Sequence, residues 1–159
     1  MSFGILAHTF GQRPHQELAQ IIGEHGFSYV QLALAKAFSD MPSQNGRLSP
    51  GYGRRIAQTF GQHGVRVAVL GCYVDLTHPD PVQRRWAVDR FKEHLRYARD
   101  FGTSHVATET GHFAPDRDDE EGWALLRESI QELVAEAERF GVFVTIEAAL
   151  GHRIRSVED

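Results

Sequence analysis

The sequence predicts an α/β fold of repeated strand–helix units with a parallel sheet, and three observations lead to this. Four segments share one pattern, the end of a helix, then a glycine, then a β-rich run. Their glycines, Gly26, Gly64, Gly102 and Gly141, are spaced by 38, 38 and 39 residues and stand where helices end in a left-handed residue. Strands that alternate with helices are joined by right-handed crossovers and therefore run parallel.

Five strands are expected, at residues 3–10, 27–34, 65–71, 104–110 and 142–148. Each is short and rich in β-branched or aromatic residues, which favour extended backbone. In the last strand, alternation places Val144 and Ile146 on one face and Thr145 and Glu147 on the other. The aliphatic face suits packing against helices, so the opposite face ends in a carboxylate.

Helices are expected between the strands. Ser49-Pro50 and Asp80-Pro81 each place a capping side chain before a proline at the first helical position. Carboxylates at 118–121 stand at the positive end of another helix. Apolar residues recur at helical spacing in three groups, which are Leu18, Ile21 and Ile22; Val88, Phe91, Leu95 and Ala98; and Trp123, Leu126, Ile130, Leu133, Val134 and Ala137. Trp86 is likewise expected on a buried helix face.

Composition narrows the class of protein. The chain has 159 residues, a net charge of −4 and one cysteine, Cys72. No linker divides it, so residues 1–159 are expected to form a single domain. A lone cysteine and the lack of a signal peptide suit the cytoplasm. No basic run points to nucleic acid, and no apolar stretch approaches the roughly 18 residues of a membrane span.

Two architectures satisfy this order of elements. The strands form either part of a (β/α)8 barrel, which usually needs about 250 residues, or an open doubly wound sheet, which suits this length. The open sheet would normally carry a helix after its fifth strand, and only eleven residues follow Ala148. Its nucleotide-binding version would also have a glycine-rich loop after the first strand, which is missing. In both, the functional site lies at the carboxyl ends of the strands.

Polar side chains gather at these strand ends. The candidates are His8, Thr9, Gln31, Cys72, Tyr73, Asp75, His78, Glu109, Thr110, His112, Glu147 and His152. Glu147 is the most informative, because a carboxylate that ends an apolar strand is costly to bury unless it is paired or bound to a metal. A glutamate that simply reaches solvent is the alternative.

The other candidates are less specific. Glu109 either takes part in chemistry or caps a turn. His8 and His152 are ligands, substrate donors or polar rim residues. Cys72 has no basic neighbour in sequence and suits packing better than nucleophilic attack. Asp80 is expected to cap a helix.

The chain resembles the sugar phosphate isomerase/epimerase family of the xylose-isomerase-like TIM-barrel superfamily. The resemblance covers nearly the whole chain in order and is most specific in four places, GCYVDLTHPD at 71–80, FKEHLRYARDFG at 91–102, TETG at 108–111 and VTIE at 144–147. It implies that residues 1–159 form the N-terminal part of such a barrel, a partial (β/α)8 fold. Two positions depart from the family pattern, with Ala148 where proline is frequent and Asp75 where asparagine is common.

The resemblance also implies a site. Glu147 matches a glutamate that in the family is both metal ligand and acid/base group, and His152 resembles a histidine that often follows it. The complete family site holds a divalent metal (Mn²⁺, Mg²⁺, Co²⁺ or Zn²⁺), whose other ligands come from later strands that are absent here. Around a small sugar or sugar phosphate, the residues expected to bind are His8, Cys72, Asp75, His78, Glu109 and His152.

The expected function is part of a divalent-metal-dependent sugar or sugar-phosphate isomerase/epimerase that moves a proton α to a carbonyl. The isolated chain is expected to have little or no activity, because a single glutamate leaves a metal under-coordinated. A non-catalytic sugar-binding or assembly module of the same fold is the alternative. A DNA-repair endonuclease on this barrel is disfavoured by the net charge of −4. Five strands leave two open sheet edges, which a second copy of the chain would bury.

Overall fold

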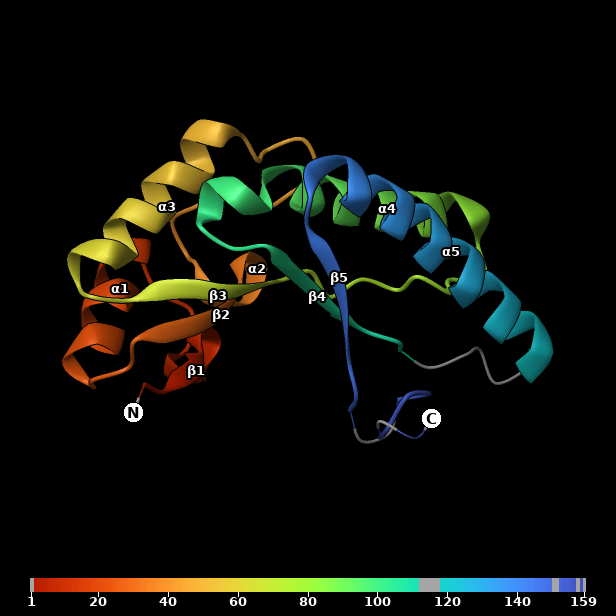
Figure 1. Cartoon of the computed structure of the whole chain (residues 1–159), viewed down its shortest axis with the longest axis horizontal. Coiled ribbons are helices and arrows are strands. Elements are labelled where there is room, and N and C mark those ends of the chain that lie inside the picture. The colour runs from red at the N-terminus through yellow and green to blue at the C-terminus, as the bar shows by residue number, and fades with distance from the viewer. Residues whose placement is uncertain (1, 112–117, 150–151, 157, 159) are drawn as a thin grey trace.

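The sheet of the protein is fully parallel. The structure is a computed structural model that describes residues 2–111, 118–149, 152–156 and 158; the candidate His112 lies outside these ranges. Its strands are β1 (Gly4–Leu6), β2 (Tyr29–Ala33), β3 (Arg66–Gly71), β4 (His105–Glu109) and β5 (Phe143–Glu147), in the spatial order β1-β2-β3-β4-β5 (Figure 1). Consecutive strands are therefore neighbours, as in a barrel, whereas doubly wound sheets reverse their strand order at a switch point.

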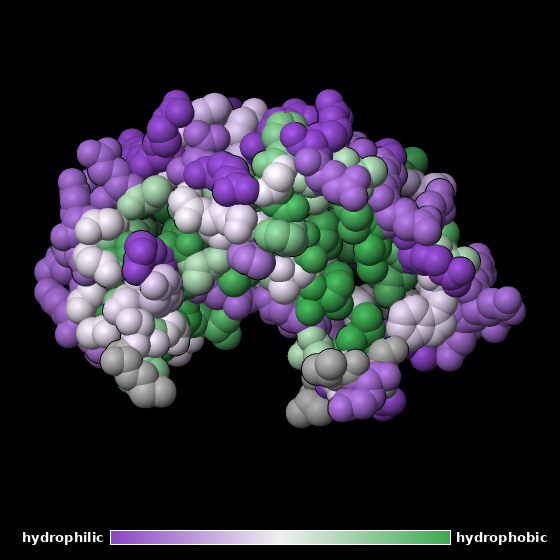
Figure 2. Space-filling view, in the orientation of Figure 1, coloured by the Kyte–Doolittle hydropathy of each residue, from purple (hydrophilic) through white to green (hydrophobic). Residues whose placement is uncertain are grey.

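The helices of the βα units are α1 (His15–Glu24), α3 (Pro50–Gln62), α4 (Pro81–Tyr97) and α5 (Asp119–Phe140). In Figure 1, α3, α4 and α5 arch along one side of the sheet. Figure 2 shows a hollow on the opposite side of the molecule. A doubly wound sheet would carry helices on both faces, so this arrangement is that of an incomplete barrel.

One hydrogen bond reports how strongly the sheet curves. The Gln31 amide on β2 donates to the Glu147 carboxylate on β5, with Nε2 and Oε1 2.6 Å apart. These strands are separated by β3 and β4, so in a flat sheet they would lie about 14 Å apart. Side chains that stand perpendicular to a flat sheet would not meet across that distance. The sheet therefore bends toward the face that carries Gln31 and Glu147.

The predicted helix boundaries are confirmed by their capping bonds. Ser49 Oγ accepts a hydrogen bond from the Tyr52 N–H at 3.1 Å, and the Asp80 carboxylate accepts one from the Val82 N–H at 2.8 Å. The four repeat glycines all have positive φ, between 61° and 84°. This conformation is costly for residues with a side chain, which explains the glycine at each of these turns.

The core lies between the helices and the convex face of the sheet. It includes Leu18, Ile22, Phe91, Leu95, Leu126 and Leu133, all fully buried or nearly so. Two expectations were wrong, because Val134 is 41% exposed and Trp86 is 50% exposed. Each helical residue turns by about 100°, so Val134 lies to the side of Leu133, and Trp86 lies about 200° from Val88.

Two strand boundaries also differ from the prediction. The first strand ends at Leu6, and a 3₁₀ turn, η1 (Ala7–Phe10), follows it. The pairing of β1 with β2 runs from Gly4–Tyr29 to Leu6–Gln31. The next residues leave the sheet and close a turn, with the Gly11 N–H donating to the His8 carbonyl. β2 ends at Ala33 and leads into α2 (Leu34–Ala37), a short helix that the sequence did not predict.

No helix in the described ranges is long and apolar enough to cross a membrane.

The two outer strands of the sheet expose large apolar side chains. Within the described residues, β1 pairs only with β2, and β5 only with β4. Leu6 is 42% exposed and Phe143 is 60% exposed. Unpaired edges with apolar side chains favour association, and burial of these edges by a second copy of the chain stays a prediction.

Candidate functional site

The Glu147 carboxylate is held from two other strands at the carboxyl end of the sheet. The Gln31 amide donates to Oε1 at 2.6 Å, and the Tyr73 hydroxyl donates to Oε2 at 3.1 Å. The Gln31 amide also donates to the Tyr73 hydroxyl. Gln31 lies on β2, and Tyr73 follows β3 by two residues. Donors on both oxygens fix the direction of the carboxylate on the concave face. A catalytic group needs such fixed orientation to act at one defined point.

The Tyr73 ring is itself fixed on two sides. The Lys36 ammonium lies 4.1 Å from the ring centroid, which is a cation–π contact. Gly71 leaves room for the ring, because a Cβ at that position would lie 3.0 Å from the ring atom Cε2. Burial, together with the Glu147 charge, raises the pKa of Tyr73, so the hydroxyl stays protonated and remains a donor.

We expect Tyr73→Phe to lower the free energy of unfolding by about 1.5 kcal/mol, because it removes a hydrogen bond to a charged group. Gly71→Ala is expected to cause a similar loss, because the new Cβ displaces the same ring. If so, the double variant loses much less than the sum of the two single losses. Urea unfolding of the four proteins measures this, and additive losses would mean that Gly71 does not act through Tyr73.

Two carboxylates and a histidine stand side by side at this edge. Glu109 and Glu147 are register partners in neighbouring strands, so their side chains leave the same face. His152 Nε2 lies 3.8 Å from the nearest Glu109 oxygen, and its Nδ1 accepts a hydrogen bond from the Gly111 N–H at 3.1 Å. This hydrogen bond requires a lone pair on Nδ1, so the proton of the neutral ring lies on Nε2, facing Glu109.

An open cavity of about 350 Å³ lies next to this pair, lined by Tyr73, Val74, Asp75, Thr108, Glu109, Gly111 and His152. The chain after β5 returns over the end of β4 and forms one wall. The Ile154 N–H donates to Thr110 Oγ1 at 3.1 Å, and the Arg153 guanidinium pairs with Asp119 at the start of α5. Three predicted residues, Asp75, Glu109 and His152, thus share one cavity, and Glu147 adjoins it through Glu109 and Tyr73.

Asp75 is held at the rim of this cavity, and the predicted residues His78, Cys72 and His8 lie outside its lining. Asp75 Oδ1, at its rim, accepts hydrogen bonds from the N–H and Oγ1 of Thr77. His78 Nδ1 accepts one from the Asp80 N–H at 3.1 Å, at the start of α4. Cys72 is buried, and burial raises the pKa of its thiol to about 12, so it remains a neutral thiol. His8 lies in η1, where burial and then the Lys36 charge lower its pKa.

The described residues do not by themselves form a metal site. Across 2–111, 118–149, 152–156 and 158, no three His, Cys, Asp or Glu side chains come close enough together to hold an ion. Both oxygens of Glu147 have protein donors, and His152 directs its protonated nitrogen toward Glu109. No step of the chemistry is therefore assigned to a metal held by this chain alone.

Sequence reasoning named Glu147, Gln31 and Tyr73 as strand-end candidates but did not predict that the last two hold the first. Gln31 and Tyr73 are polar residues at strand ends, yet nothing in their spacing singled them out as partners of Glu147. The only signal for Tyr73 was its position two residues after a strand-terminal glycine. Lys36 carried no signal, because it lies in the unpredicted helix α2.

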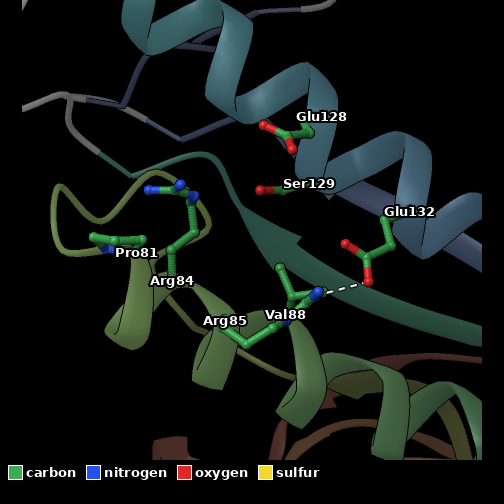
Figure 3. A pocket seen from close by; sticks show the side chains of 7 residues that line it. All are labelled: Pro81, Arg84, Arg85, Val88, Glu128, Ser129 and Glu132. Carbon is green, nitrogen blue, oxygen red and sulfur yellow. Dashed lines mark hydrogen bonds and ion pairs between the residues drawn. The ribbon is translucent and has the colours of Figure 1, made fainter.

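A further cavity, of about 130 Å³, lies between α4 and α5 rather than at the strand ends (Figure 3). The charged residues in its walls are Arg84, Arg85, Glu128 and Glu132. Arg85 and Glu132 form an ion pair, with Nη2 and Oε1 2.8 Å apart. These charges balance one another, so this cavity favours neither anions nor cations.

Comparison with known proteins identifies the family of the chain. The family described as xylose isomerase-like TIM barrel matches residues 19–159. No curated protein matches the chain in sequence.

The fold is similar to solved structures of sugar epimerases. A D-psicose 3-epimerase determined in the presence of D-fructose has a TM-score of 0.71 and 15% identity, over 98% of this chain and 54% of that one. The D-psicose 3-epimerase from Clostridium cellulolyticum H10, with D-tagatose, has a TM-score of 0.69 and 17% identity, over 91% and 51%. The IOLI protein with a bound zinc atom has a TM-score of 0.68 and 18% identity, over 92% and 51%. The chain thus spans about half the length of the structures it matches.

Proposed function

Because the chain belongs to the xylose isomerase-like TIM-barrel family, we propose that it carries the N-terminal half of the active site of a sugar or sugar-phosphate isomerase/epimerase. The observation that supports this is the Glu147 carboxylate, held by Gln31 and Tyr73 at the carboxyl end of the curved sheet. This is the end at which barrel enzymes place their chemistry.

In this proposal Glu147 removes or returns the proton on a carbon next to the sugar carbonyl. A carboxylate is suited to this as a general base, provided that it is aimed at the carbon. The Gln31 amide and the Tyr73 hydroxyl aim it, and the protonated hydroxyl also offers a donor near the charge that develops on the substrate oxygen. Asp75, Glu109 and His152 would bind the hydroxyl groups of the sugar in the adjoining cavity.

The chain alone is expected to bind a sugar weakly and to turn it over little or not at all. Proton removal and return on opposite faces of a carbon need two groups, and the structure aims one carboxylate, Glu147. A metal with partners from later strands would polarise the carbonyl in a complete barrel.

The test uses the 159-residue chain with D-fructose and follows both partners by NMR, the protein amides in H₂O and the sugar in D₂O. In H₂O, amide shifts are expected to concentrate at Tyr73, Glu109 and Gly111. In D₂O, deuterium incorporation and D-allulose formation are expected to stay at background. Glu147→Gln is the matched variant and should retain the fold. Shifts elsewhere, or none at saturating sugar, would refute the sugar site, and robust turnover would refute the expected inactivity.

A non-catalytic sugar-binding module is the second candidate. One observation favours it, namely that the described residues bring no three metal-binding side chains together. The NMR experiment addresses it when diamagnetic Mg²⁺ is titrated into the same samples. Sugar binding that is indifferent to Mg²⁺ and to Glu147→Gln would favour the module over the enzyme half.

A further inference from the structure

We propose that a smaller cavity on the other side of the Tyr73 ring binds the phosphoryl group of the substrate, so that this chain is built for a sugar phosphate rather than a free sugar. The inference rests on the proposed function for the identity of the sugar. The cavity shares Tyr73 with the site near Glu147, and it adds Arg90 and His94, which that site does not use.

The cavity lies where β2 and β3 end against α2 and α4. Its volume is about 50 Å³, and its lining is Ala33, Leu34, Ala35, Lys36, Gly71, Cys72, Tyr73, Arg90 and His94. A single water needs about 10–15 Å³ of such space. The cavity therefore accommodates a group of a few heavy atoms, such as a phosphoryl group, but not a sugar ring.

Two cations line this cavity, and among the described residues neither is held in an ion pair with a carboxylate. In the described part of the chain, neither Lys36 nor Arg90 forms an ion pair with an acidic side chain. Arg90 donates instead to the neutral Asn45 side chain at 3.2 Å. Glu93 is nearby, but its two oxygens accept the N–H groups of Gly46 and Leu48.

The charge of Arg90 acts on two other residues in the cavity lining, Cys72 and His94. Burial raises the pKa of Cys72; the Arg90 charge acts in the opposite direction and the Glu93 charge in the same direction. Burial, with a smaller contribution from the Arg90 charge and against the hydrogen bond to the Arg90 carbonyl, lowers the pKa of His94 to about 4. His94 Nδ1 lies 2.9 Å from the Arg90 carbonyl, which can only accept, so the ring proton lies on Nδ1. At neutral pH the charged side chains in the lining are therefore Lys36 and Arg90, both positive, which suits an anion such as a phosphoryl group.

Tyr73 connects this cavity to the proposed reaction centre. Its ring lines both cavities, its hydroxyl donates to Glu147, and Lys36 lies over its face. A phosphoryl group beside Lys36 and a carbonyl near Glu147 would thus be separated by the length of one phenol side chain. That spacing suits two ends of the same small molecule.

The experiment is a calorimetric titration of the full chain with inorganic phosphate at constant ionic strength, with acetate as a second anion. Lys36→Gln is expected to weaken phosphate binding about tenfold, because one charge-assisted contact is lost. Arg55→Gln on the exposed face of α3 removes the same charge away from the cavity and should change it less than about twofold. D-fructose 6-phosphate should bind at least about tenfold more tightly than D-fructose.

Several results would overturn the inference. These are acetate binding as tight as phosphate, an equal effect of Lys36→Gln and Arg55→Gln, or no preference for the phosphorylated sugar. Lys36 is exposed, so its variant should fold, and circular dichroism checks this. Phosphate binding without sugar binding would refute only the proposed function, and sugar binding without phosphate binding would refute only this inference.

Discussion

Lowering the pH from 7 to 4 is expected to reduce the free energy of unfolding by about 3 kcal/mol through His94 alone. His94 is 1% exposed, and burial lowers its pKa from 6.5 to about 4. Between these values the unfolded chain binds a proton that the folded chain does not. The contribution is therefore complete above pH 6.5 and is lost as the pH falls toward 4.

Urea unfolding at a series of pH values measures this effect. His94→Gln is the matched variant, because glutamine also offers an N–H to the Arg90 carbonyl but does not titrate. The variant is expected to be less stable at pH 7, yet to lose much less stability than the natural chain between pH 6.5 and 4. Parallel profiles for the two proteins would show that the acid sensitivity comes from other groups.

Gly23→Ala is expected to lower the free energy of unfolding by about 2 kcal/mol, because it forces α1 away from the end of α3. A Cβ at position 23 would lie 2.6 Å from the backbone oxygen of His63 and 2.9 Å from its Cβ. Backbone atoms cannot rotate away as a flexible side chain does. The clash therefore outweighs the roughly 1 kcal/mol that alanine gains over glycine in a helix.

Gly61→Ala is the control for this substitution. Gly61 lies in α3, is exposed, and would place its Cβ with no heavy atom within 4 Å. Alanine there should raise stability by about 0.5–1 kcal/mol through helix propensity alone. Thermal or urea unfolding of both variants gives the comparison, and equal effects of the same sign would contradict the close approach of α1 and α3.

The order of strands and helices was predictable because its signals are local. A glycine at each helix end, a proline after Ser49 and Asp80, and the alternation before Glu147 act within a few residues of one another. The structure confirms the capping bonds and the positive φ values, and Glu147 lies at the end of β5 as expected. The family resemblance, like these signals, is a property of short runs in order.

Boundaries and exposure were less predictable because they depend on partners. The first strand ends at Leu6, where its pairing with β2 stops although β2 continues to Ala33, and a 3₁₀ turn follows. Trp86 has the large apolar side chain that is typical of a core residue, yet half of it is exposed. In the described residues, no neighbouring element covers that side of α4. A window of sequence contains no information about such neighbours.

The sequence by itself determined five parallel strands, the helices between them and the glutamate at the end of the last strand. Only the tertiary structure decided between the curved and the open sheet, through the Gln31–Glu147 bond between residues 116 positions apart. It also decided that Tyr73 lines two cavities and that Lys36 and Arg90 both line one of them. The physical reason is that backbone preference acts within a few residues, whereas side-chain hydrogen bonds and charge pairing depend on distances that exist only after the sheet has curved.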